Sequence, residues 1–217
     1  MELRADAFRN RAAIVEAAGE MFAADGMDVP LDDIARRAGV GNATLYRRFP
    51  TRGDLVVAVF AERMAEHLGA VEAGLADPDP WNGFASYIRT AAAMQARDLG
   101  IADLVTMDVS VAAEIERLRS RAFDGLVELV VRARSAGALR ADFTTEDVVI
   151  LLMANAGLVE RAHGVTAEAS ARLIHILLDG FRAQATSESP PPPSPRRMRV
   201  AMRHNGARCL GTARKDT

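Results

Sequence analysis

The sequence predicts an all-α protein of about nine helices that ends in a tail. Apolar residues recur at spacings of three and four through most of the first 185 residues, which is the period of an amphipathic helix. No stretch combines apolar–polar alternation with β-branched enrichment, so we expect no sheet. Glycine, proline and short polar residues interrupt the pattern where helix ends need them.

The first predicted helix covers Ala7–Asp25. Ile14, Ala18 and Phe22 recur every four residues and form one apolar stripe that can face a core. Gly26 follows directly, at the position where the end of a helix favours glycine. The segment is therefore expected to be an amphipathic helix with a defined C-terminal end.

Two short helices are predicted next, over Leu31–Ala38 and Asn42–Phe49. Pro30 suits the start of the first helix because the N–H group that proline lacks is not needed there. Gly39 ends that helix, and Asn42 is the expected N-cap of the second. Only a tight turn is left between the two helices.

Capping residues mark the start of two longer helices. Thr51 and Asp54 form a capping-box pair at the start of a helix over Arg52–Ala76. Asp79 is expected to cap a fifth helix over Pro80–Ala96, because proline fits the first helical position.

Four more helices and a tail complete the predicted chain. Polar residues that can cap a helix stand near the start of the last three. The helices are expected over Ile101–Met107, Ser110–Ala136, Thr144–Ala162 and Thr166–Ala185. Residues 186–217 contain four successive prolines and a basic stretch without apolar periodicity, so we expect a disordered tail there.

The composition limits the class of protein. The chain has 217 residues, a formal net charge of −2 and one cysteine, which excludes a disulfide framework and a cysteine-based zinc site. We find neither an apolar run of about 20 residues nor a signal-peptide core, and so expect a soluble, cytoplasmic protein with no membrane partner. Residues 1–53 carry 8 basic and 8 acidic side chains, whereas residues 54–185 carry 12 and 19. An acidic body is repelled by DNA, so DNA contact is expected in the first segment.

The two short helices have the residue spacing of a helix-turn-helix. Ala35, Gly39 and Leu45 stand at relative positions 1, 5 and 11. The alanine lets the two helices cross closely, the glycine takes a turn conformation that a β-carbon disfavours, and the leucine packs the second helix onto the core. A helix-turn-helix presents the N-terminal half of its second helix to the major groove, so the spacing predicts DNA binding.

Side chains suited to DNA contact gather in the second short helix and at the start of the next helix. Hydroxyl and guanidinium groups bond phosphates and base edges. The free N–H groups at a helix start also favour a phosphate. The candidate DNA-binding residues are Asn42, Ala43, Thr44, Tyr46, Arg47, Arg48, Thr51 and Arg52.

The run Leu31–Leu55, LDDIARRAGVGNATLYRRFPTRGDL, resembles the DNA-binding domain of TetR-family transcriptional regulators. The preceding helix matches the family at Phe22, Ala23 and Gly26, and the total length also agrees. More weakly, the body is similar to the SbtR-like C-terminal subfamily, at Trp81, Phe84, Tyr87 and residues 95–100.

This resemblance implies a homodimer that binds a palindromic double-stranded DNA operator and represses transcription until a small-molecule effector releases it. It implies a helix-turn-helix domain over residues 1–53 and a helical ligand-binding and dimerisation domain over residues 54–185. By matching position, Thr44, Tyr46 and Arg52 contact phosphates, whereas Ala43, Arg47 and Arg48 lie at or near the groove.

The sequence departs from the family pattern at two places. Val29 and Pro30 stand where a serine or threonine is common, and Gly41 replaces a frequent serine, which removes hydroxyl groups that could contact phosphate.

Two other kinds of function stay open. One is an activator or a ligand-independent regulator, because the position of the operator relative to the promoter decides whether transcription rises or falls. The other alternative is a helical binding module or enzyme with a vestigial DNA-binding head.

Large apolar side chains in the body suggest a ligand pocket. Methionine and aromatic residues suit adaptable apolar cavities, but the same residues at helical spacing also describe an ordinary core. A single asparagine in an apolar helix can serve a ligand or an interhelical bond. The candidate ligand-binding residues are Phe60, Met64, Trp81, Met94, Met107, Phe123, Met153 and Asn155.

The last two predicted helices are apolar on more than one face. A surface helix needs only one buried stripe, so a second apolar face predicts a dimeric four-helix bundle. A central position in a monomer core is the alternative. The candidate dimer residues are Leu151, Ala154, Leu158, Leu173, Leu177, Gly180 and Phe181.

Catalytic and metal-binding patterns are missing from the sequence. The four histidines, at positions 67, 163, 175 and 204, have no ligand spacing, so we expect no metal. There is no phosphate-binding loop or nucleophile elbow, so we expect neither a cofactor nor an enzyme. The basic tail, with 7 basic and 2 acidic residues, either adds salt-dependent affinity for DNA or is a plain solvated extension.

Overall fold

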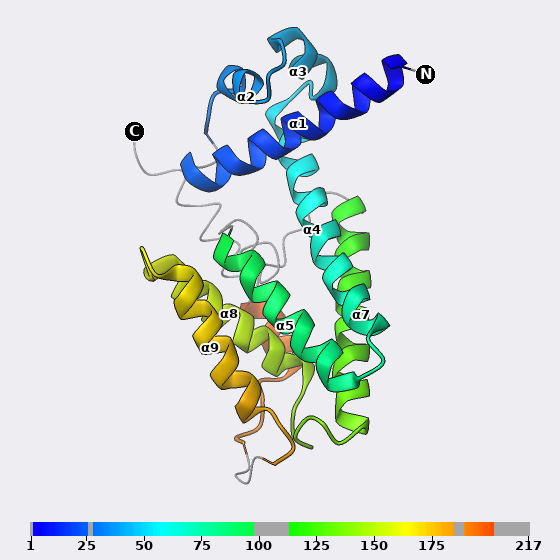
Figure 1. Cartoon of the computed structure of the whole chain (residues 1–217), viewed down its shortest axis with the longest axis vertical. Helices are drawn as coiled ribbons and strands as arrows, with labels where there is room; N and C mark the ends of the chain where they lie inside the picture. Colours follow the sequence, from blue (N-terminus) through cyan, green and yellow to red (C-terminus); the bar gives the residue numbers. More distant parts are fainter. Residues whose placement is uncertain (1, 26–27, 98–112, 185–188, 202–217) are drawn as a thin grey trace. The chain divides into compact units, whose positions relative to one another are not determined.

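The structure, a computed structural model, describes residues 2–25, 28–97, 113–184 and 189–201. These residues form helices and no strand, apart from one isolated bridge between Leu139 and Arg182. The all-α fold class predicted from the sequence is thereby confirmed. The chain divides into two compact units, Met1–Arg63 and Met64–Thr217 (Figure 1).

The first unit contains α1 (Glu2–Asp25), α2 (Leu31–Arg37), α3 (Asn42–Arg48) and the first part of α4 (Arg52–Ala76). α1 begins at Glu2 and is longer at its start than the predicted segment. One apolar cluster joins the four helices. Its fully buried members are Ile14, Ala18, Ile34, Ala35, Leu45 and Leu55.

The turn between α2 and α3 has the conformation that the sequence predicts. Gly39 adopts a φ of 66°, in the left-handed region that favours glycine. The Gly39 N–H donates to Arg36 O at 3.2 Å, and the Val40 N–H donates to Ala35 O at 3.0 Å. These two bonds form a Schellman motif, which satisfies carbonyl groups at the end of α2.

The N-cap of α3 differs from the prediction. Gly41, with an extended backbone, is the N-cap residue, and Asn42 is the first helical residue instead. The Gly41 carbonyl oxygen accepts the N–H groups of Thr44 and Leu45, at 2.8 and 3.2 Å, without a side-chain cap. Helical geometry therefore begins one residue too early for the Asn42 side chain to act as the cap.

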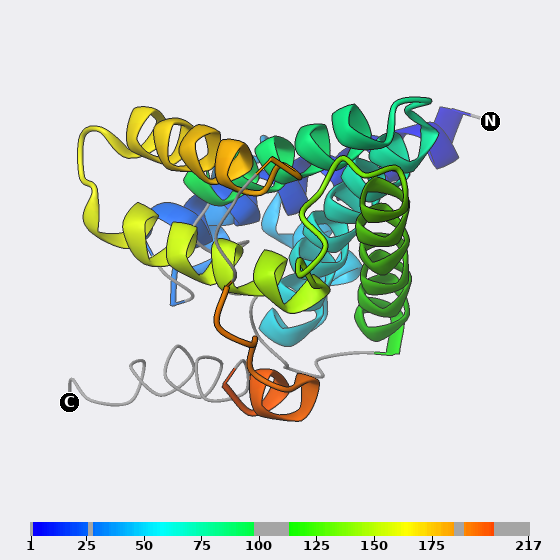
Figure 2. The same ribbon diagram turned by 90° about the horizontal axis from the view of Figure 1, so that it is seen from below.

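The second unit contains the rest of α4 with α5 (Pro80–Arg97), α7 (Ala113–Ser135), α8 (Thr145–Arg161) and α9 (Thr166–Gly180). α5 packs against α7, α8 and α9, and Figures 1 and 2 show it between these helices. α4 and α5 approach each other closely at Gly74 and Gly83. A β-carbon on Gly83 would stand only 2.2 Å from Gly74 O, so this approach depends on the missing side chain. The predicted helix over 101–107, with Met107, and the predicted cap at position 110 lie outside the described residues.

The end of α9 also differs from the prediction. The helix ends at Gly180 rather than at Ala185, because the chain turns back onto the loop before α8. The Arg140 N–H donates to Phe181 O at 3.0 Å, and the Ala183 N–H donates to Ala138 O at 3.2 Å. These bonds replace the helical ones, which explains the early stop.

Part of the predicted tail is described as well. Residues 195–201 are helical, and Met198 in this segment is buried. The Ser189 N–H donates to Asp142 Oδ2 at 3.0 Å. Residues 189–201 therefore include one buried side chain and one backbone hydrogen bond to the loop before α8.

None of the helices within the described ranges has the length and apolar character needed to cross a membrane.

Candidate nucleic-acid interface

α3 is a short helix with a buried side and a polar side. Leu45 and the adjoining Phe49 lie in the core of the first unit. Tyr46 is 48% exposed, and Arg47 and Arg48 are exposed as well. The core contacts fix the orientation of α3, so its polar side is held toward solvent.

The first turn of α3 places three more of the predicted DNA-binding residues together. Asn42 and Ala43 are exposed, and Thr44 is half-buried. Their backbone positions adjoin the N-terminus of α3, which is the end that a helix-turn-helix directs into the major groove. Six of the eight predicted residues therefore belong to this one helix.

The arginines of the first unit differ in their partners. Arg36 pairs with Asp33 on α2, and Arg37 Nε donates to Glu20 at 2.9 Å. In the part of the chain that the structure describes, neither Arg47 nor Arg48 pairs with a carboxylate. Two neighbouring arginines without a carboxylate partner among the described residues therefore lie on α3.

Arg52 has a contact that the sequence does not reveal. Its Nη1 donates a hydrogen bond to Val29 O at 2.7 Å. The bond joins the start of α4 to the loop before α2, where the family pattern usually has a serine or threonine. Arg52 is thus a structural residue of the helix-turn-helix as well as a predicted phosphate ligand.

Asp54 occupies the N-terminus of α4. Its Oδ2 accepts the Thr51 N–H at 3.0 Å and the Thr51 hydroxyl at 2.8 Å, and the Asp54 N–H donates to Thr51 Oγ1 at 3.2 Å. The predicted capping box is confirmed. Its carboxylate complements the helix dipole in the place where a phosphate was expected, so a phosphate at this helix start meets a like charge.

The predicted ligand-binding residues differ in their exposure to solvent. Within the described residues, four are buried, two are half-buried and one is exposed. Met64, Trp81, Met94 and Asn155 are buried, Phe60 and Met153 are half-buried, and Phe123 is 50% exposed. Six of these seven side chains are therefore buried or half-buried.

Asn155 belongs to a buried hydrogen-bonded chain across three helices. Its Nδ2 donates to Gln95 Oε1 on α5 at 2.9 Å, and the Ser170 hydroxyl on α9 donates to Asn155 Oδ1 at 2.8 Å. All three side chains are buried, and Gln95 Nε2 has no acceptor among the described residues. The interhelical bond is the role that Asn155 has in the structure.

A second buried polar pair lies between α4 and α5. The Tyr87 hydroxyl and His67 Nε2 are 3.4 Å apart, and the two rings meet edge to face. Burial lowers the pKa of His67 to about 4 and raises the pKa of the Tyr87 hydroxyl well above its usual range. His67 is therefore neutral in the folded protein near pH 7.

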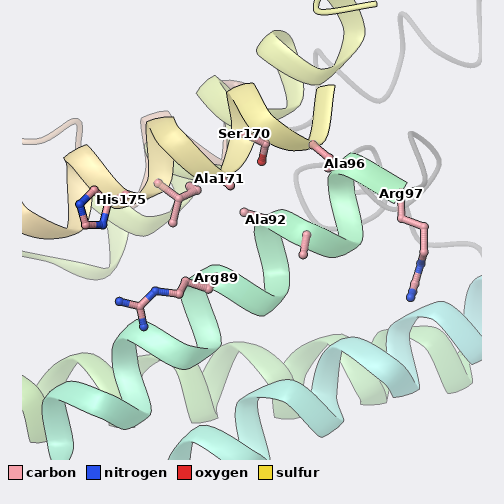
Figure 3. Close-up of a pocket in the computed structure, with 10 residues that line it drawn as sticks. Arg89, Ala92, Ala96, Arg97, Ser170, Ala171 and His175 are labelled. Carbon is pink, nitrogen blue, oxygen red and sulfur yellow. The ribbon is translucent and has the colours of Figure 1, made fainter. Parts of the chain in front are cut away.

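A groove lies between α5 and α9, as Figure 3 shows. Its volume is about 390 Å³, and none of the predicted ligand-binding residues lines it. Five of its ten lining residues are alanines from both helices, with Ser170 and Ile174 among them and arginine and histidine at its ends. Alanines carry no sequence signal for a ligand site, so the sequence could not indicate this groove.

The predicted dimer residues fall into three groups. Leu151 is buried in the core of its own unit, and Ala154 and Gly180 are exposed. The half-buried members are Leu158, Leu173, Leu177 and Phe181. Two apolar residues that the prediction missed, Ile150 on α8 and Ile176 on α9, are 42% and 56% exposed. The outer surface of both helices is therefore partly apolar.

Two family patterns match the chain. The pattern described as bacterial regulatory proteins, tetR family, matches residues 14–59, which include α2 and α3. The pattern described as transcriptional regulator SbtR-like, C-terminal domain, matches residues 79–183, which include α5 and α7 to α9. None of the curated proteins compared with the chain matches it.

Several solved structures are similar over most of their length. A TetR transcription regulatory protein from Mycobacterium vanbaalenii is 35% identical, with a TM-score of 0.63 over 83% of this chain and 99% of that one. The TetR transcriptional regulator SCO0520 from Streptomyces coelicolor is 30% identical, with a TM-score of 0.62 over 81% and 99%. The FadR regulator from Bacillus subtilis, solved in complex with stearoyl-CoA, is 16% identical, with a TM-score of 0.59 over 79% and 99%, and shares the fold.

The family patterns and the two relatives at 30% identity or more agree with the helix-turn-helix geometry described above. These relatives are regulators of transcription and not enzymes. The chain belongs to the TetR family of bacterial transcriptional regulators.

Proposed function

We propose that the protein is a cytoplasmic homodimeric repressor that binds a palindromic operator and is released by a small molecule. The main support for DNA binding is that α3 bears two exposed arginines, neither of which has a carboxylate partner in the described part of the chain. The domain roles follow: residues 1–53 bind DNA, and residues 54–185 bind the ligand and dimerise.

α3 is the proposed recognition helix. Arg47 and Arg48 supply guanidinium groups for phosphates or guanine edges, and Thr44 and Tyr46 supply hydroxyl groups. Arg52, whose Nη1 bonds Val29 O, is proposed to contact a phosphate from its place at the start of α4. Because Asp54 bonds the Thr51 hydroxyl, Thr51 is proposed to contribute less than these residues.

The outer faces of α8 and α9 are the proposed dimer interface. Ile150 and Ile176 are exposed on these faces, and the exposed Ala154 and Gly180 permit close approach of a second pair of helices. A two-fold dimer places two copies of α3 on related half-sites, which is why the operator is proposed to be palindromic.

Recovery of genomic DNA fragments bound by the full chain tests this function. We expect the fragments to share a palindrome, and a reporter gene behind that palindrome to be expressed less when the protein is present. Fragments without a two-fold repeat contradict the dimeric operator. A reporter that responds with increased expression at the same sites contradicts repression but not DNA binding.

A further inference from the structure

We propose that the groove between α5 and α9 binds a small aliphatic carboxylate, with the carboxylate at the end where Arg89 and His175 lie. This carboxylate is the class of small molecule that releases the protein from DNA in the function proposed above. Only that effect on DNA rests on the proposed function. Binding itself is a property of the second unit.

The shape of the groove suits a linear apolar chain. Alanines face each other across it because both helices present small side chains there (Figure 3). The alanines are Ala92, Ala93, Ala96, Ala167 and Ala171. A volume of about 390 Å³ is near the lower end of the range for ligand pockets, so the ligand is a small molecule.

The charge at one end of the groove selects the head group. Arg89 is exposed, and within the described residues it has no carboxylate partner. His175 lines the same end (Figure 3), with the Asp179 carboxylate 3.8 Å from its Nε2. Arg97 at the other end already pairs with Glu66, so the available cation is Arg89. A carboxylate on Arg89 forms a charge-assisted pair in which both oxygens can accept.

Ser170 joins the groove to the core. It lines the groove and is itself buried, with its hydroxyl bonded to Asn155. Asn155 continues to Gln95, whose Nε2 is a buried donor without an acceptor among the described residues. The groove surface therefore includes one end of the buried chain that connects α9, α8 and α5, so ligand contact at Ser170 reaches all three helices.

Calorimetric titration of the full chain tests the site directly, with octanoate as the probe and octan-1-ol and octylamine as matched compounds. We expect octanoate to bind, and each matched compound to bind at least tenfold more weakly. Arg89→Gln is expected to weaken octanoate binding at least tenfold. Ala93→Leu, at an exposed position that lines the groove, is expected to abolish binding because the leucine fills the groove. The controls are Arg117→Gln on α7 and Ser86→Leu on α5, both at exposed positions outside the groove, and both are expected to bind octanoate normally.

Three outcomes overturn the proposal. The first is no octanoate binding to the unaltered protein, and the second is equal binding of octanoate and octylamine. The third is a loss of the dimer in Ala93→Leu but not in Ser86→Leu, which assigns the groove to a protein interface. Octanoate binding that fails to change operator affinity contradicts the proposed release from DNA and leaves the carboxylate site standing.

Discussion

Arg52 Nη1 donates a hydrogen bond to Val29 O across 2.7 Å and so ties the start of α4 to the loop before α2. The two residues are 23 positions apart, and the bond joins the segments that precede and follow the helix-turn-helix. Because the bond is partly buried, its loss affects stability as well as any contact of Arg52 with DNA.

Replacement of Arg52 by alanine is expected to lower the free energy of unfolding by about 1 to 3 kcal/mol, since a carbonyl group loses a charged partner. Urea unfolding measures this change. Arg48→Ala is the matched control, because Arg48 is an exposed arginine whose removal is expected to leave stability unchanged. Equal stabilities of the two variants contradict a structural role for Arg52.

Gly39→Ala is expected to destabilise the protein by about 1 to 2 kcal/mol, since φ is 66° there and an alanine is strained in that region. Open space surrounds the position, so backbone strain alone causes the loss. Gly69→Ala is the control: it lies inside α4, also in open space, and is expected to stabilise by about 1 kcal/mol. Thermal unfolding of both variants checks the opposite signs.

Stability is expected to fall as the pH is lowered from about 6.5 to about 4, because of His67. Burial lowers its pKa from 6.5 to about 4, so the unfolded chain takes up a proton in this window and the folded chain does not. The contribution is fully present above pH 6.5, and the loss by pH 4 is about 3 kcal/mol. Urea unfolding across this range measures it. His67→Gln is expected to flatten the dependence, and an unchanged slope in that variant assigns the effect to other groups.

Ile176→Asp is expected to convert the proposed dimer to a monomer, because a charge is placed on the exposed apolar face of α9. Sedimentation velocity measures the mass. Val131→Asp on α7 is the control, since Val131 is 51% exposed and Ile176 is 56% exposed, and it is expected to leave the dimer intact. Two monomeric variants, or two dimeric ones, count against the α8–α9 interface.

The features predicted well from the sequence are those encoded by neighbouring residues. The capping box of Thr51 with Asp54, the turn at Gly39 and the apolar side of α3 each depend on a few consecutive positions, so local chemistry is enough to predict them. For the same reason the candidate DNA-binding residues could be named together.

Features that depend on distant partners could not be predicted. α9 stops at Gly180 because the following residues bond to the loop around Leu139, some forty positions earlier. The bond from Arg52 to Val29 and the groove between α5 and α9 likewise require two segments to be placed against each other. The residues proposed for the ligand because of their size, such as Trp81, do not line that groove.

The salt dependence of operator binding tests the central claim, that α3 contacts DNA through Arg47 and Arg48, which have no carboxylate partner among the described residues. The measurement compares Arg47→Ala/Arg48→Ala with the matched pair Arg36→Ala/Arg37→Ala, whose arginines already have acidic partners. We predict that the Arg47/Arg48 variant binds the operator at least tenfold more weakly, and that its salt slope is smaller by about 1 for each phosphate contact removed. We predict that the operator affinity of the Arg36/Arg37 variant stays within about twofold of that of the unaltered protein. Equal affinities and slopes for the two variants would contradict the account.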